Sequence, residues 1–64
     1  MIHEILRTMK RNDGSVTGYA RVETFNDYET ALNKLGEYAL IIPASELVLV
    51  EVKPMEFKVQ VTKL

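Results

Sequence analysis

The fold of this chain is decided by residues 26–36, which read Asn-Asp-Tyr-Glu-Thr-Ala-Leu-Asn-Lys-Leu-Gly. Four apolar side chains in this stretch follow the i, i+3, i+4, i+7 spacing of a helix that lies with one face on a core: Tyr28, Ala31, Leu32 and Leu35. The spacing predicts a short helix over residues 27–35, and the rest of the chain must supply the surface on which it packs.

Residues suited to capping stand at both ends of this predicted helix. Asn26 is a good N-cap, and Glu29 three residues later can complete a capping box. Gly36 can adopt the left-handed conformation that ends many helices. We therefore expect the helix to end before residue 37.

The segment before the helix predicts a β-hairpin. Residues 12–15 read Asn-Asp-Gly-Ser, a strong turn signal, and Val16–Phe25 has the composition of a strand. Alternation puts Val16, Ala20 and Val22 on one side, and Thr17, Tyr19, Arg21, Glu23 and Phe25 on the other. The turn sets Lys10 opposite Thr17, Thr8 opposite Tyr19 and Leu6 opposite Arg21.

Residues 2–11 admit two interpretations. As the partner strand of the hairpin they satisfy the Asp-Gly turn, but their two faces mix aliphatic and charged side chains. The same residues also fit a basic amphipathic helix, with Ile2, Ile5, Leu6 and Met9 at helical spacing. The turn favours the strand.

The last third of the chain predicts a second hairpin. With Pro54 and Met55 as a two-residue turn, Glu51 lies opposite Lys58 and Lys53 opposite Glu56, which are favourable cross-strand pairs. The same register gathers apolar residues on one face: Val48, Val50, Val52, Phe57, Val59 and Val61. Because proline at the first turn position does not suit the primed turns of tight hairpins, the loop has room to be a residue or two longer.

A short apolar segment, residues 37–42, lies between the helix and this hairpin and predicts a further strand that ends at Pro43. The expected fold class is therefore α+β, a two-layer sandwich with one short helix on a mostly antiparallel sheet. The expected element order is β-β-α-β-β-β.

Length and composition limit how this fold is stabilised. The chain has 64 residues and no cysteine, which predicts one small domain over residues 1–64 without disulfides. A core of this size is marginal, so self-association is the remaining way to bury more apolar surface. We expect a homo-oligomer.

Charge and hydropathy point to a cytoplasmic protein. The formal net charge is −1, with a surplus of cations in residues 1–21 and 52–64 and a surplus of carboxylates between them. This balance argues against a uniformly basic nucleic-acid binder. No apolar run is long enough for a signal peptide or a membrane span, so we expect no membrane association.

No arrangement of residues predicts catalysis. His3 is the only histidine, so neither a catalytic triad nor a metal site with several histidines can be assembled, and we expect His3 near the surface or a strand end. The glycines form no phosphate-binding loop. We expect a non-enzymatic protein without cofactor or metal.

Two surfaces are candidates for function. The first is a basic, aromatic surface on the N-terminal hairpin, suited to a nucleotide or single-stranded nucleic acid: Arg7, Lys10, Arg11, Tyr19 and Arg21. The second is an oligomer or partner interface, in which the predicted register turns apolar residues outward: Leu47, Leu49, Tyr19 and Phe25. Both surfaces also have an ordinary interpretation. For the first, a solvated hairpin is the favoured one, and for the second, inclusion in the core has equal weight.

Residues 13–19, followed by Thr24, Phe25 and a helix with an acidic start, resemble the hairpin-then-helix layout of compact accessory proteins of phages and mobile elements. The resemblance implies a binding protein rather than an enzyme. Our leading hypothesis, which rests on the small size, the absence of catalytic groups and the spare apolar surface, is a small interaction protein that acts as a homo-oligomer, for example as a phage-type inhibitor of a host or defence protein. The alternative is a nucleotide or nucleic-acid binding module that uses the basic hairpin.

Overall fold

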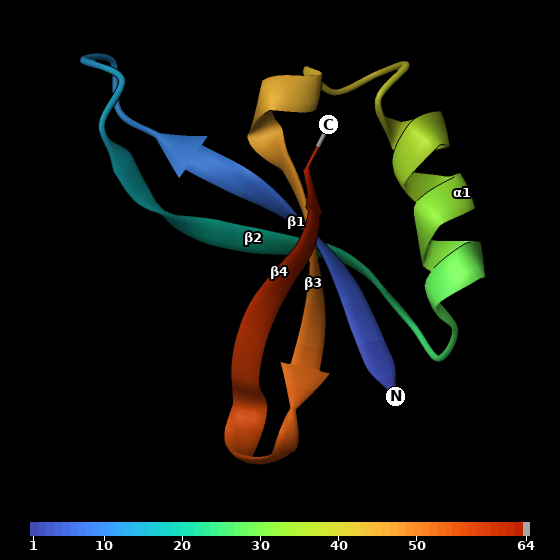
Figure 1. The fold of residues 1–64 in the computed structure, drawn as a ribbon. Coiled ribbons are helices and arrows are strands. Elements are labelled where there is room, and N and C mark those ends of the chain that lie inside the picture. The colour runs from blue at the N-terminus through green and yellow to red at the C-terminus, as the bar shows by residue number, and fades with distance from the viewer. Residues whose placement is uncertain (64) are drawn as a thin grey trace.

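The protein is a four-stranded antiparallel sheet with one helix, as seen in a computed structural model that describes residues 1–63 (Figure 1). The expected α+β class is therefore confirmed. The strands lie in the order β2-β1-β3-β4, so β2 and β4 form the two edges. The elements are β1 (Ile2–Lys10), β2 (Val16–Phe25), α1 (Tyr28–Tyr38), β3 (Leu47–Lys53) and β4 (Phe57–Lys63), with single 3-10 turns at Ala44–Glu46 and Pro54–Glu56.

The N-terminal hairpin forms as the Asp-Gly turn predicts, and of the two interpretations of residues 2–11 the strand is confirmed, with bounds Ile2–Lys10. The Asp13 carboxylate accepts hydrogen bonds from the Ser15 N–H at 2.9 Å and its hydroxyl at 2.7 Å, and Gly14 takes a φ of 88°. The predicted pairings of Thr8 with Tyr19 and of Leu6 with Arg21 are confirmed. Lys10 pairs with Val16 rather than Thr17, because the register shifts beyond Met9.

A bulge at Val22 changes which side chains of β2 share a face. Ile5 pairs with Glu23 and Leu6 with Arg21, so Val22 is the extra residue between them. The predicted grouping of Phe25 with Tyr19 and Arg21 is therefore wrong. Phe25 lies on the helix side of the sheet, while Tyr19 and Arg21 lie on the opposite side.

The helix begins one residue later than expected and continues past Gly36. Asp27, not Asn26, is the N-cap, and its side chain accepts a hydrogen bond from the Thr30 N–H at 2.9 Å. The helix extends because its apolar stripe does: counting three and four residues on from Leu35 reaches Tyr38 and Ala39, which pack against the core.

The predicted strand over residues 37–42 is consequently wrong, and the element order is β-β-α-β-β. Tyr38 belongs to the helix, and its hydroxyl donates a 2.7 Å hydrogen bond to Glu23. Leu40 and Ile41, which the strand would have buried, are exposed in the connection to β3.

The C-terminal hairpin is shifted by one residue from the predicted register. Its turn holds three residues, Pro54–Glu56, and Met55 adopts a left-handed φ of 66°. Lys53 therefore pairs with Phe57 and Glu51 with Val59, and the predicted Glu51/Lys58 and Lys53/Glu56 pairs do not oppose each other. Because side chains alternate along a strand, the one-residue shift moves Phe57 and Val59 to the opposite face from the predicted one.

The core lies between the helix and one face of the sheet. Its buried members come from the helix and three strands: Ile5, Phe25, Ala31, Leu35, Leu47 and Leu49. Leu47 and Leu49 are 1% and 0% exposed, so the expectation that they face outward is wrong. The helix packs mainly on β1, β2 and β3, and a hydrogen bond between the Tyr28 and Thr62 hydroxyls joins it to β4.

Candidate functional site

The face of the sheet that points away from the helix, here called the open face, is covered by no other element of residues 1–63 (Figure 1). Pairing and alternation assign its members. They are Ile2, Glu4, Leu6, Thr8 and Lys10 from β1, Val16, Tyr19, Arg21 and Thr24 from β2, Val48, Val50 and Val52 from β3, and Lys58 and Gln60 from β4.

Glu4 stands near the centre of the open face and is 5% exposed. Its Oε1 lies 2.8 Å from Lys58 Nζ, and its Oε2 lies 3.5 Å from Arg21 Nη1. The Lys58 ammonium, with Arg21 on the other side, holds the pKa of the Glu4 carboxyl below its ordinary value, although burial acts in the opposite direction. One buried carboxylate thus fixes two cations that come from the two edge strands.

An apolar floor lies beside this charged cluster. Leu6 and Val50 are buried, although no element covers them. A hollow of about 240 Å³ lies over the floor and is lined by Leu6, Tyr19, Val48, Val50, Lys58 and Gln60. Long polar and aromatic side chains therefore surround a small apolar centre on the open face.

Charges are separated between the two sides of the molecule. The open face holds Lys10, Arg21 and Lys58 against the single carboxylate of Glu4. The helix side holds six of the nine carboxylates: Glu23, Asp27, Glu29, Glu37, Glu46 and Glu51. The nearly neutral net charge is therefore the sum of a cationic face and an acidic one.

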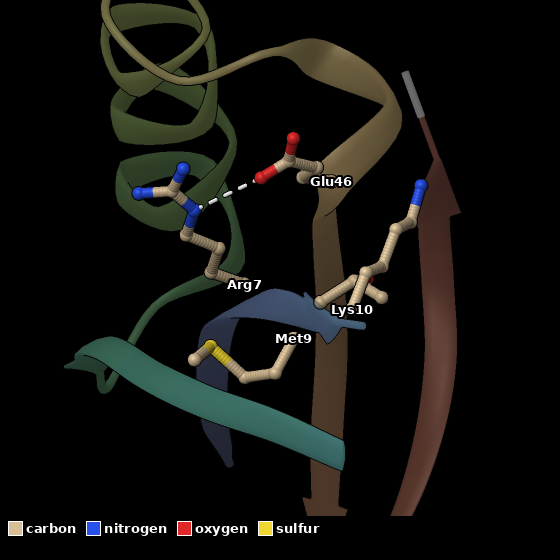
Figure 2. Close-up of a pocket in the computed structure, with 5 residues that line it drawn as sticks. Arg7, Met9, Lys10 and Glu46 are labelled. Carbon is tan, nitrogen blue, oxygen red and sulfur yellow. Dashed lines mark hydrogen bonds and ion pairs between the residues drawn. The ribbon is translucent and has the colours of Figure 1, made fainter. Parts of the chain in front are cut away.

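The predicted basic surface is only partly assembled. Tyr19 and Arg21 share the open face, and Tyr19 is 60% exposed. Arg7 lies on the helix side instead, where its Nε contacts Glu46 Oε1 at 3.0 Å. Figure 2 shows this ion pair at a hollow of about 310 Å³ that Met9 and Lys10 also line. Arg11 follows β1 at the start of the turn.

The predicted apolar interface is not assembled. Leu47, Leu49 and Phe25 are buried in the core, which leaves Tyr19 as the exposed member of that set. Exposed apolar surface lies instead on the edge strand β4, where Phe57 is 66% exposed and Val59 is also exposed. Both side chains are on the helix side, at a part of the sheet that the helix hardly reaches.

Sequence reasoning missed Glu4, Lys58, Phe57 and Val59 as members of candidate surfaces. Glu4 could have been identified as a lone carboxylate between apolar residues of β1. A charge that is buried in a strand is costly unless it is paired, so its position indicated a nearby cation. The other three were assigned to the wrong faces by the one-residue shift in the hairpin.

His3 lies near the start of β1, as one of the two expected positions has it, but its side chain is buried rather than at the surface. Its ring lies against Tyr28 with centroids 5.4 Å apart, and it pairs across the strands with Glu51. Within residues 1–63, no group of three or more histidine, aspartate or glutamate side chains is arranged to hold a metal ion. None of the described helices is long and apolar enough to cross a membrane.

Comparisons with protein-family models, curated proteins and solved structures return no match for this chain, so the proposals below rest on its own residues.

Proposed function

We propose that this protein is a non-enzymatic binding protein that acts as a homodimer, formed by antiparallel pairing of the β4 strands of two copies. The observation that carries the proposal is the position of β4. It is an edge strand whose outer side has no partner among residues 1–63, and it presents the exposed side chains of Phe57 and Val59. Exposed edge strands with apolar side chains are templates for pairing with another strand.

The sequence of β4 suits pairing with itself. Residues 57–61 read Phe-Lys-Val-Gln-Val and alternate apolar with polar. Antiparallel pairing centred on Val59 sets Lys58 opposite Gln60 of the partner, so no two cations face each other across the new ladder. A dimer of this kind has the twofold symmetry of most small homo-oligomers.

The other edge strand is less suited to pairing. β2 has two register irregularities along its pairing with β1, and β4 has one, near its C-terminal end. Bulges twist an edge away from regular pairing, and natural sheets use them to protect exposed edges. The comparison favours β4 as the dimer edge.

Dimer formation would also stabilise a short chain by burying more of its apolar surface. A domain of about 60 residues buries only about 60% of the surface that its unfolded chain exposes. Phe57 and Val59 have neither a helix nor a fifth strand beside them. A second copy of β4 would bury part of this surface in both chains.

Sedimentation equilibrium of the wild type and of Val59→Lys tests the proposal. A lysine on an edge strand opposes strand pairing, so we expect Val59→Lys to be a monomer at concentrations at which the wild type is a dimer. Val16→Lys is the matched control, since Val16 is an exposed valine on the other edge strand, and it should remain a dimer.

Circular dichroism and thermal melts of the same samples show whether each variant folds. A folded Val59→Lys variant that dimerises as tightly as the wild type would contradict the proposal. So would loss of the dimer in Val16→Lys, because that result would place the interface on β2.

A further inference from the structure

The open face presents an aromatic ring and two cations around one hollow. Tyr19 and Lys58 line the hollow, and Arg21 is held beside it through Glu4. The Arg21 side chain is 67% exposed, and its Nη1 lies 3.5 Å from Glu4 Oε2. A guanidinium has five N–H donors and an ammonium three, so both cations keep donors for a ligand above the face.

Glu4 lies beneath Lys58 and Arg21 and forms ion pairs with both. Because it is buried, it fixes the positions of Lys58 and Arg21 without presenting its own charge at the surface. Two cations around one carboxylate leave the cluster with a net positive charge, and Lys10 on the same face adds to it. The acidic groups of the molecule lie mostly on the helix side. The open face is therefore complementary to an anion.

The shape of the site limits the size of this anion. Every residue that lines the hollow belongs to the open face, so a ligand lying there is covered on one side only. Small-molecule sites usually enclose most of the ligand surface. A site that contacts its ligand from one side only, at several points, suits an extended ligand instead.

We propose that the open face binds single-stranded nucleic acid, with a base stacked on Tyr19 above the apolar floor and backbone phosphates held by Lys58 and Arg21. Stacking of bases on aromatic side chains and contact of phosphates with cations are the two contributions on which sequence-tolerant single-strand binding depends. The site is independent of the proposed dimer, because Phe57 and Val59 lie on the other face of the sheet.

An acidic protein segment is the competing occupant. Its carboxylates would satisfy the cations equally well, but it brings no planar group for Tyr19, whose ring is mostly exposed. Tyr19 therefore favours the nucleic acid, and the test must separate stacking from charge.

The first experiment measures charge recognition. Fluorescence anisotropy with a labelled oligouridylate gives the association constant at several salt concentrations. We expect binding at low salt, and we expect Lys58→Ala and Arg21→Ala each to reduce the slope of log affinity against log salt by about 0.7, the value for one phosphate contact on a single strand. Lys34→Ala is the matched control, since the Lys34 side chain on the helix is 44% exposed against 41% for Lys58.

The second experiment measures stacking. Tyr19→Ala should weaken binding of the oligouridylate at least about fivefold, the lower end of the effect of removing one base stack. Tyr19→Phe keeps the ring and should bind as the wild type does. Neither substitution should affect folding, because the side chain is largely exposed.

Three results would overturn the proposal. The first is no binding of the oligonucleotide by the folded protein at low salt. The second is unchanged binding by Tyr19→Ala together with displacement of the oligonucleotide by polyglutamate at equal charge concentration, which would assign the face to an acidic protein. The third is equally tight binding of uridine monophosphate, which would assign it to a mononucleotide.

Discussion

Glu4 is the residue that joins the two edge strands across the open face. It lies on β1, next to the middle of the sheet, and contacts Arg21 of β2 and Lys58 of β4. A buried carboxylate is unfavourable unless it is paired, and here both of its oxygens face a cation. Leu6 and Val50 beside it are kept from water without a second layer. At the scale of single residues, Glu4 organises the proposed binding face.

The depressed pKa of Glu4 predicts a specific pH dependence of stability. A carboxyl whose pKa is lower in the folded state stabilises the fold above its ordinary pKa of 4.5, and this contribution is lost as the pH falls through the folded value. Urea unfolding of the wild type and of Glu4→Gln should therefore differ by about 1–2 kcal/mol at neutral pH, since the partners are partly exposed, and should converge at strongly acidic pH.

Glu37→Gln is the control for this experiment, because Glu37 forms an exposed ion pair with Lys34 on the helix. Its effect should be no more than a few tenths of a kcal/mol at neutral pH. A difference between the wild type and Glu4→Gln that stays constant from neutral to acidic pH would refute the assigned role of Glu4.

Met55 is a second residue with a testable energetic effect. Its left-handed φ of 66° is unfavourable for a side chain with a Cβ by about 1–2 kcal/mol, and its own side chain is fully exposed in the turn. Met55→Gly should raise the free energy of unfolding by up to about 1 kcal/mol, because the added flexibility of glycine in the unfolded chain offsets part of the gain. Met55→Ala keeps the Cβ and should change stability little. Equal stability of the Gly and Ala variants in urea would show that Met55 is not strained.

At the scale of elements, the sequence predicted the N-terminal hairpin better than the C-terminal one. The Asp-Gly turn has a strong conformational preference, and it placed Thr8 opposite Tyr19 and the strand Val16–Phe25 at its observed bounds. The turn at Pro54–Glu56 depends on a left-handed methionine, for which residue type gives no signal. The resulting one-residue error reversed the two faces of β4, including Phe57 and Val59. The misplacement of Leu47 and Leu49 has a separate cause, because alternation separates them from the valines of β3 and the prediction buried the valine face.

The end of the helix gives a direct test at this scale. Gly36 lies inside the helix without a positive φ, and a Cβ added to it would meet no atom within 4 Å. Gly36→Ala should therefore stabilise the protein by about 0.5–1 kcal/mol in thermal or urea unfolding. Gly14→Ala is the opposite control, because the φ of Gly14 is 88° and alanine is strained there. Destabilisation by Gly36→Ala would mean that the helix ends at Gly36, as the sequence first indicated.

At the scale of the whole molecule, one helix is too little to cover a four-stranded sheet. The helix packs on three strands of one face, so the open face and the β4 edge remain without a second layer. The short length and the single helix predicted that part of the sheet would be uncovered. They did not show which part it would be. Lys58 reaches Glu4 only because β1 lies between β2 and β3, a pairing of segments far apart in the chain. Tyr19 and Arg21 were identified because their hairpin is local.

The central claim is that a second copy of the chain covers the β4 edge. Sedimentation equilibrium of the wild type over a wide range of concentrations tests it most directly. The account predicts that the weight-average mass rises from the 7.3 kDa of one chain and levels off at twice that value. A mass that stays at 7.3 kDa up to the solubility limit would contradict the account.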